Sequence, residues 1–454
     1  MTDSCEVLVV GAGLAGLQCA REMQAAGRDV QVWEAADDVG GRIRTEQVDG
    51  FLVDRGFQVL NPAYPAVRRW VDVGALELQP FGAGLGVRRD AGFAVLAHPL
   101  REPRLIARTL GSGIATPRDA AALLRWAAPA FVRSWGHYDD GGRLDGGRRA
   151  GRRLAGRLLT GKSERDVALR QALDEAGFSG ELRRVVEQFF AGVLLEDDGS
   201  TSNDFARLLL RTFALGVPGL PRLGMQALPR QLAASLAAPV RTRTRVESIR
   251  REGGSLLVRA AGAELRAEQV VLATDPVSAG PLARGYNDGG PAAGGSAAGG
   301  SRPAMKGVLT HWFAASEPPS RLNMLCVDAR EPRGGPLVNT AVVSNAAPGY
   351  APAGRHLVQT SALFGAGRPV PGEDEVRQHA AEIYGSDATA WELVARHEVP
   401  QALPVQPPPL ASPLPAEASP GLFLCGDYRA TASIQGALAS GHHAAQAVLR
   451  PDFG

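Results

Sequence analysis

The feature that most constrains this chain is the glycine pattern of Gly11-Ala12-Gly13-Leu14-Ala15-Gly16, which directly follows the apolar run from Cys5 to Val10. A buried strand, a glycine turn and a helix in this order are typical of a dinucleotide-binding unit. Gly11 permits the tight turn, Gly13 lets the backbone approach a pyrophosphate, and Gly16 lets the helix pack against the strand. The N-terminus of that helix is then aimed at the phosphates.

An acidic residue supports this interpretation. Val30-Gln31-Val32-Trp33 predicts the next strand, and Glu34 closes it. A carboxylate at this point can accept hydrogen bonds from both ribose hydroxyls and would repel a 2′-phosphate, which argues against NADP. The alternative is an ordinary glycine turn in a chain that has 55 glycines. The helical spacing after Leu14, which stops at Gly27, makes that alternative the weaker one.

A second glycine pair and an arginine follow the acid in the run Glu34-Ala35-Ala36-Asp37-Asp38-Val39-Gly40-Gly41-Arg42. A guanidinium there can bind phosphate with two parallel hydrogen bonds. In this run the chain resembles the FAD-binding flavoproteins of the amine oxidase, protoporphyrinogen oxidase and carotenoid (phytoene) desaturase superfamily. The resemblance implies that FAD is held by Glu34, Ala35, Gly41 and Arg42. The alternative is a glycine turn with exposed arginines.

The resemblance recurs near the C-terminus. Gly421 to Cys425 predicts a buried strand, Gly426 and Asp427 follow it, and Ser433 to Gly441 opens a helix of small residues. In the resembled family the aspartate meets the ribityl or pyrophosphate portion, and the helix N-terminus, here Ile434, faces the flavin pyrimidine. A positive helix end there would stabilise the anionic reduced flavin. The alternative is a C-terminal helix that only packs closely.

Weaker matches lie between these two motifs, in the order that the family has them. Asp54 to Val59 resembles the segment that passes near the flavin ring, with Gly56 and Phe57 beside it. Gly219 to Pro229 resembles the segment before the adenine strand. Val246 would meet adenine through its backbone, and Val270 to Thr274 resembles the strand that leaves the FAD domain.

The resemblance implies an α/β fold with two domains. A discontinuous, Rossmann-like FAD-binding domain takes residues 1–86, 216–280 and 395–454, and an α+β substrate domain with a helical subdomain takes 87–215 and 281–394. Periodicity predicts helices around Pro117 to Arg133, Asp166 to Glu175 and Glu181 to Phe190, and strands at Val308 to Phe313 and Leu337 to Ser344. The site is expected between the halves. Gly285 to Ser301 is expected to form a flexible surface loop.

Composition excludes some functions and narrows the setting. A net charge of +2 gives no electrostatic case for nucleic acid. The N-terminal apolar run carries Glu6 and belongs to the nucleotide fold, so no signal peptide is expected, and no apolar run is long enough to span a membrane. The arginines from Arg143 to Arg157 predict a solvated helix face, with contact to anionic lipid headgroups, and so peripheral membrane association, as the alternative.

The four cysteines, Cys5, Cys19, Cys326 and Cys425, form no CxxC pair. They predict buried free thiols and a cytoplasmic, reduced protein. None lies between His397 and Pro420, where some relatives tether the cofactor, so noncovalent FAD is expected.

One lysine is the candidate catalytic residue. The chain has only two lysines, Lys162 and Lys306, among 49 basic residues. In amine oxidases a lysine in the comparable region holds a water at flavin N5, and Lys306 in Met305-Lys306-Gly307-Val308 is the match. The alternative is an edge-strand lysine in solvent. We expect His311 to be a core histidine bonded to a backbone carbonyl. The less favoured alternative is a catalytic base.

Three functions remain open at this point. Monoamine oxidases frame the flavin with two tyrosines, and the alignment of Gly436-Ala437 puts Ser433 where one of them would stand. That departure favours an FAD-dependent oxidoreductase that dehydrogenates an apolar small molecule by hydride transfer to flavin N5, with oxygen or a quinone as acceptor. The alternatives are a flavin amine oxidase acting on a C–N bond and a non-redox flavin-dependent isomerase.

Overall fold

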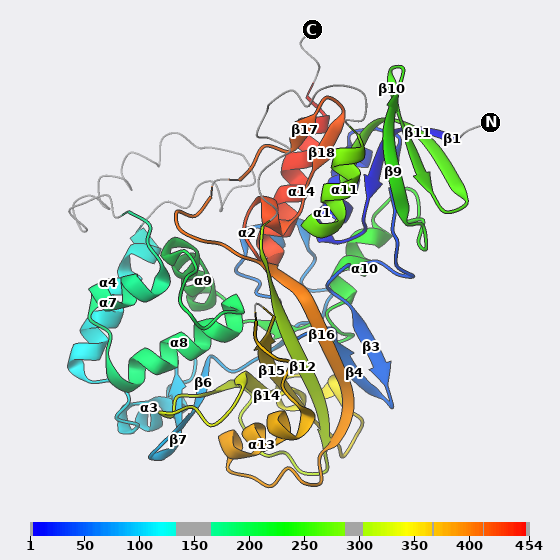
Figure 1. Cartoon of the computed structure of the whole chain (residues 1–454). Helices are drawn as coiled ribbons and strands as arrows, with labels where there is room; N and C mark the ends of the chain where they lie inside the picture. The colour runs from blue at the N-terminus through cyan, green and yellow to red at the C-terminus, as the bar shows by residue number, and fades with distance from the viewer. Residues whose placement is uncertain (1–2, 133–164, 287–302, 366, 412, 451–454) are drawn as a thin grey trace.

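A computed structural model describes residues 3–132, 165–286, 303–365, 367–411 and 413–450 and contains two large sheets (Figure 1). The first is seven-stranded, in the order β17-β18-β11-β1-β2, with β10 and β9 continuing from β11. The strands β2, β1, β11 and β18 run parallel. Their bounds are Asp3–Val10 (β1), Val30–Trp33 (β2), Val246–Glu252 (β9), Ser255–Ala260 (β10), Ala263–Leu272 (β11), Glu417–Ser419 (β17) and Leu422–Leu424 (β18).

Helices α1 (Leu14–Ala25) and α14 (Ile434–Val448) lie against each other beside this sheet (Figure 1). A β-carbon at Gly441 would lie 2.2 Å from the Ala15 carbonyl oxygen, so only glycine allows the two helices to approach this closely. The N-terminal and C-terminal ends of the chain are therefore packed into one domain. Helices α10 (Ala227–Ala234) and α11 (Pro276–Gly285) complete this part of the fold.

The second sheet is also seven-stranded, in the order β16-β12-β15-β14-β13-β6-β7. Strand β12, the second in this order, is buried almost throughout, which indicates that both of its faces are covered. Helix α13 (Glu373–Tyr384) covers one face through Val376, Ala380 and Ile383. The strands are Gly84–Arg89 (β6), Gly92–Ala97 (β7), Met305–Ala315 (β12), Leu325–Asp328 (β13), Leu337–Val342 (β14), His356–Phe364 (β15) and Glu392–Pro404 (β16).

A helical layer packs against the second sheet, with α8 in contact with β13 and β14. Trp126 lies at the centre of its core, where its ring meets Phe178 and Phe190 edge to face. The layer contains α3 (Ile106–Gly111), α4 (Pro117–Val132), α7 (Leu169–Ala176), α8 (Gly180–Leu194) and α9 (Asn203–Leu215). The three helices expected from periodicity correspond to α4, α7 and α8.

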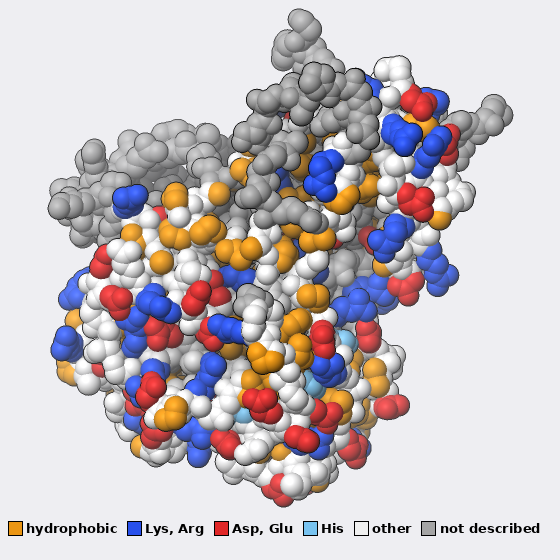
Figure 2. All heavy atoms as spheres, viewed as in Figure 1, with side chains coloured by type: hydrophobic (Ala, Val, Ile, Leu, Met, Phe, Trp, Pro, Cys, Tyr) orange, Lys and Arg blue, Asp and Glu red, His pale blue; other side chains and the backbone are white. Residues whose placement is uncertain are grey.

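Short elements connect these parts. They are β3 (Thr45–Val48), β4 (Phe51–Asp54), α2 (Pro65–Trp70), β5 (Gln79–Pro80), β8 (Gly219–Leu220) and α12 (Val343–Ala346), with single 3₁₀ turns at Pro103–Leu105, Pro348–Tyr350 and Asp427–Arg429. No helix in the described ranges is long and apolar enough to cross a membrane. Acidic and basic side chains are intermixed over the face shown in Figure 2.

Several expected boundaries differ from the structure. Residues 84–86, expected in the cofactor-binding domain, belong to β6 of the second sheet, and residues 281–285, expected in the substrate domain, belong to α11, which packs on β9. The sequence places residue 395 at the start of the last cofactor segment, but β16 pairs with β12 from Glu392 to Pro404, so residues 395–404 belong to the second sheet. Tyr286, expected in the flexible loop, is buried after α11 and donates a hydrogen bond of 2.5 Å to the Pro420 carbonyl. The rest of that loop, 287–301, and the arginine run 143–157 lie outside the described residues.

Candidate active site

The first glycine turn has the geometry that a pyrophosphate needs. Gly11 has a φ of +106°, and a β-carbon there would lie 2.9 Å from the Ala273 carbonyl oxygen at the end of β11. A β-carbon at Gly16 would lie 2.0 Å from the Gly11 oxygen. At Gly13 it would meet nothing within 4 Å, and α1 begins without a side-chain cap. The turn is therefore closely packed at Gly11 and Gly16 and open at Gly13. On the open side, the amides of Gly13, Leu14 and Ala15 can face an anion.

Glu34 is held beside this turn. One carboxylate oxygen accepts a hydrogen bond from the Ala12 amide at 2.7 Å, and the other accepts one from the Ala36 amide at 2.8 Å. The Glu34 carbonyl accepts a further bond from Thr244, so the segment that leads into Val246 runs alongside. Val246 is buried at the start of β9, whereas Ala35 is exposed. The acid expected at the ribose is thus bonded to the segment that leads into the residue expected at the adenine.

Arg42 joins the two motifs that are most distant in sequence. Its guanidinium donates to the Asp427 carboxylate at 2.6 Å and to the Ala402 carbonyl at 2.8 Å. Burial by itself lowers the pKa of Arg42, but Asp427 more than offsets this and holds the pKa above its usual value. A β-carbon at Gly41 would lie 3.5 Å from the Gly13 α-carbon, so the two glycine turns adjoin. These contacts bring the N-terminal and C-terminal motifs together in the fold.

The loop with Gly56 and Phe57 is anchored by Asp54. The Asp54 carboxylate accepts hydrogen bonds from the Thr45 hydroxyl at 2.5 Å, the Met225 amide at 3.0 Å and the Tyr350 hydroxyl at 3.1 Å. Burial raises the pKa of Asp54 to about 6. The bond to Met225 brings the two weaker sequence matches, 54–59 and 219–229, into contact.

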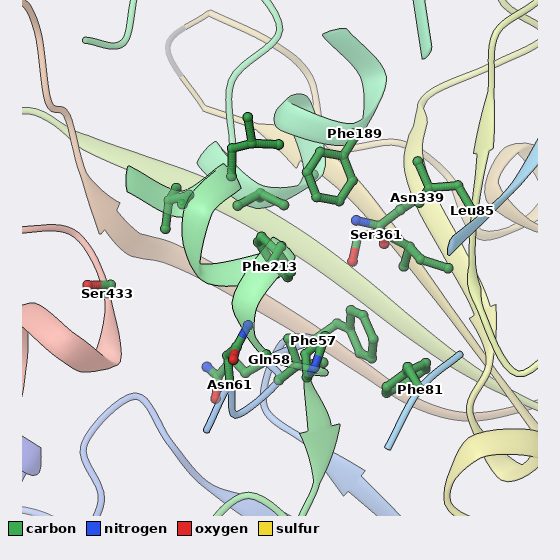
Figure 3. Close-up of a pocket in the computed structure, with 18 of the residues that line it drawn as sticks. Phe57, Gln58, Asn61, Phe81, Leu85, Phe189, Phe213, Asn339, Ser361 and Ser433 are labelled. Atoms are coloured by element: carbon green, nitrogen blue, oxygen red, sulfur yellow. The ribbon is translucent and has the colours of Figure 1, made fainter. Parts of the chain in front are cut away.

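A cavity of about 630 Å³ lies next to these residues, between the two sheets and the helical layer (Figure 3). Arg42, Gly56, Phe57 and Ile434 line it from the part expected to hold the cofactor. The opposite part of its lining comes from the helical layer and the second sheet, through Phe189, Val193, Phe213, Val308, Leu325, Asn339 and Ser361. A cavity of this size is typical of a small-molecule site.

The chemistry of this lining is apolar and lacks negative charge. Aromatic side chains contribute Phe57, Tyr64, Phe81, Phe189 and Phe213. None of the described lining residues is Asp or Glu; the ionisable ones besides Tyr64 are Arg42, Arg55, Arg101 and His98. Arg55 is paired with Glu46 at 3.0 Å, and Arg101 donates to backbone carbonyls at the end of α9.

Lys306 does not line this cavity. Its ammonium donates to the Leu194 carbonyl at 3.0 Å, the Glu196 carboxylate at 2.7 Å and the Thr201 hydroxyl at 3.0 Å, which occupies all three of its hydrogens. Burial lowers the pKa of Lys306 in spite of Glu196. The pairing of β12 with β16 shifts between Lys306 and Val308, and Val308 is the residue that faces the cavity. Spacing alone could not reveal that shift.

His311 lies on the other face of β12. It is 1% exposed and stacks on Phe313 with ring centroids 5.8 Å apart. The charges of Glu373 and Arg377 in α13 also affect its pKa. Burial, followed by the charge of Arg396, lowers its pKa to about 4. The backbone carbonyl expected to bond it is not seen at Nε2, which has no partner among the described residues. His311 is a core residue and does not reach the cavity lining.

Several residues that line the cavity belong to no sequence motif. Asn339 and Ser361 lie in buried strands that contain other polar residues, Thr340 in β14 and Gln359 and Thr360 in β15, so no sequence signal singles them out. Phe189 and Phe213 come from helices whose apolar faces serve the core equally well. Ser433, where an amine oxidase would have a tyrosine, lines the cavity at the N-terminus of α14.

Comparison with known proteins decides the family. The sequence pattern of the flavin-containing amine oxidoreductases matches residues 14–449. The chain belongs to this family. The resemblance seen in the motifs is thereby confirmed, and with it the α/β two-domain fold, the FAD cofactor and the assignment as an oxidoreductase.

Sequence similarity to individual members of the family is confined to short stretches. A putrescine oxidase from Kocuria rosea is 47% identical over 72 residues, which is 16% of this chain and 15% of that protein. A coproporphyrinogen III oxidase from Propionibacterium freudenreichii subsp. freudenreichii is 36% identical over 84 residues, 18% of this chain and 16% of that one.

Similarity of fold covers nearly the whole chain. A putrescine oxidase structure has a TM-score of 0.68 at 18% identity and covers 99% of this chain and 100% of that one. A putative protoporphyrinogen oxidase from Exiguobacterium sp. 255-15 has a TM-score of 0.66 at 15% identity and covers 99% of each chain. At this level of identity the family's fold is shared, whereas the substrate is a separate question.

Proposed function

We propose that this flavoprotein dehydrogenates an apolar, uncharged small molecule by hydride transfer to flavin N5. The observation that carries the proposal is the 630 Å³ cavity, which is lined mainly by apolar side chains and, in its described lining, by no carboxylate. When bound, FAD supplies the hydride acceptor. The protein then has to bind the substrate, exclude water and orient the bond to be oxidised, which an apolar cavity does.

We infer that the cofactor is held by the residues expected from the sequence. The amides of Gly11 to Gly16, with Gly41 and Arg42, would bind the pyrophosphate, Glu34 the ribose, and Val246 the adenine. Gly56, Phe57, Gly426, Asp427 and Ile434 would border the ribityl chain and the flavin ring. All four cysteines, which lie within the described ranges, are buried and unpaired, and none lines the cavity, which supports noncovalent FAD.

Amine oxidation is the second candidate, because relatives include proteins named for that activity. The cavity argues against it. A cationic amine that leaves water for an apolar cavity needs a carboxylate or an aromatic cage to replace its hydration. Three arginines line this cavity, Tyr64 is the one tyrosine among its described residues, and Ser433 stands at the helix N-terminus. The described lining therefore offers an amine neither a carboxylate nor the pair of tyrosines that frames the flavin in monoamine oxidases.

Anaerobic reduction of the holoprotein tests the choice. The flavin absorbance bands are followed while the protein is mixed with a panel of aliphatic amines, including putrescine, or with uncharged cyclic and isoprenoid compounds. We expect bleaching with members of the uncharged panel only. Rapid bleaching by an amine would overturn the proposal in favour of amine oxidation. Reoxidation of the reduced protein by oxygen or by a soluble quinone then identifies the acceptor.

A further inference from the structure

The cavity is polar at one end. Asn339 of β14 and Ser361 of β15 are paired across adjacent strands and both line the cavity. They are 4% and 3% exposed. Figure 3 shows the two side chains together on the side away from Ser433, with Phe213 between. A substrate that spans the cavity therefore has one end at this pair and the other near the N-terminus of α14.

A buried glutamine fixes which atoms of this pair face the cavity. Gln359, wholly buried on the same face of β15, donates from its amide nitrogen to the Ser361 hydroxyl oxygen at 2.5 Å and to the Asn339 carbonyl oxygen at 3.4 Å. These bonds use acceptor oxygens. The Asn339 amide nitrogen and the Ser361 hydroxyl hydrogen donate to no described residue, so the pair presents donors.

A glycine in the facing helix makes room for the Asn339 amide. Gly192 lies inside α8, where glycine is less favourable than alanine. A β-carbon at Gly192 would lie 2.3 Å from the Asn339 amide nitrogen. Glycine at this position is therefore explained by the space that the amide occupies.

Two further buried polar atoms lie beside this pair. Thr310 of β12 is paired with Ser361, and its buried hydroxyl has no partner among the described residues. The side-chain carbonyl oxygen of Gln359 also lacks a partner there. Neither Thr310 nor Gln359 belongs to the cavity lining, so the donors that a ligand meets at this end are those of Asn339 and Ser361.

We propose that Asn339 and Ser361 bind a carbonyl oxygen on the otherwise apolar substrate and thereby set its orientation. This rests on the function proposed above and specifies its substrate class. Two uncharged donors suit an uncharged acceptor, because they cannot neutralise the charge of a buried carboxylate. The substrate is thus an apolar ketone, ester or similar carbonyl compound whose oxidised bond is remote from its carbonyl.

Binding of matched probes tests the proposal without turnover. The FAD-loaded protein is titrated with a long-chain methyl ketone, the alkane of equal length and the matching primary amine, and the change in the flavin absorption spectrum gives each Kd. We expect the ketone to bind about three- to tenfold more tightly than the alkane, as one or two hydrogen bonds imply. Asn339→Leu, which keeps the volume, should abolish this preference. Asn339→Asp should reverse it in favour of the amine.

Two further variants complete the test. Ser361→Ala, a small change, should lose part of the preference for the ketone over the alkane. It replaces Asn339→Leu in the test if that variant does not fold. Phe213→Leu, the control, should weaken ketone and alkane by the same factor. Equal affinities of the native protein for ketone and alkane would overturn the carbonyl proposal and leave the proposed function intact. If neither probe binds while the amine does, the proposed function itself fails.

Discussion

Three charged side chains are held in place by specific hydrogen-bond partners. Arg42 is bound by Asp427, Glu34 by two backbone amides, and Lys306 by Glu196. The first two lie where the glycine motifs meet, whereas the third lies beyond the cavity lining. That Arg42 and Glu34 lie where the glycine motifs meet could be predicted, because the spacing of these motifs is fixed by backbone turns. The role of Lys306 depends on a partner 110 residues away, which spacing does not reveal.

Glu34→Ala should weaken FAD binding at least tenfold. The change removes the charged acceptor for the ribose hydroxyls, and a hydrogen bond to a charged group is worth about 1.5–3 kcal/mol. Quenching of flavin fluorescence on rebinding to the apoprotein gives the Kd. Asp37→Ala is the control, since that exposed acid pairs with Arg44 at 2.8 Å. Unchanged retention in Glu34→Ala would place the ribose elsewhere.

Lys306→Met should destabilise the fold and leave flavin chemistry unchanged. Lys306 and Glu196 are 10% and 9% exposed at their side chains, and breaking a buried ion pair costs about 3–5 kcal/mol. Denaturant unfolding measures the loss, and adding Glu196→Gln should recover part of it. A lysine that holds a water at flavin N5 gives the opposite result, namely native stability with slower flavin reduction or reoxidation in stopped-flow experiments.

At the scale of elements, β12 divides its residues between two environments. Val308 lies toward the cavity and Trp312 donates to the Asp54 carbonyl at 3.1 Å, whereas His311 and Phe313 face α13. Alternation along a strand is visible in a sequence, but which face meets a cavity is decided by the neighbouring strands. For the same reason β16 could not be assigned to the second sheet before its pairing was known.

The stability of the protein should fall as the pH drops from 6.5 to 4, in part because of His311. Burial lowers the folded pKa of His311 to about 4, so the unfolded chain binds a proton in this window that the folded chain does not. This favours unfolding by roughly 1–3 kcal/mol at the acid end. His311→Leu should flatten the profile of melting temperature against pH, and the half-buried His356→Leu should not. Identical slopes for native protein and His311→Leu would refute the assignment.

At the scale of the whole molecule, the fold could be predicted from motifs at its two ends. Gly11 to Gly16 and Gly426-Asp427 meet through α1, α14 and Arg42, as a dinucleotide site requires. The middle of the chain carried less information, because residues such as Phe189, Asn339 and Ser361 reach the cavity through packing.

Acid precipitation of the purified protein should release FAD into the supernatant. The four cysteines are buried and lie away from the cavity lining, so none is positioned to tether the ring. Chromatography of the supernatant against FAD and FMN standards identifies the flavin. Colour that stays in the pellet would indicate a covalent bond, and FMN would contradict the dinucleotide site.

The first sheet has a consequence for how the protein matures in the cell. Its strands come from residues 3–33, 246–272 and 417–424, and Arg42 forms its ion pair with Asp427, which is made much later. A ribosome synthesises the chain from its N-terminus, so the glycine turns are made early but stay without their last strand and with α14 missing. The dinucleotide surface is complete only after the residues of α14 have been made. We therefore expect the cofactor to bind after this helix is synthesised, and a chain interrupted before residue 417 to lack the last strand and the last helix of the cofactor-binding domain.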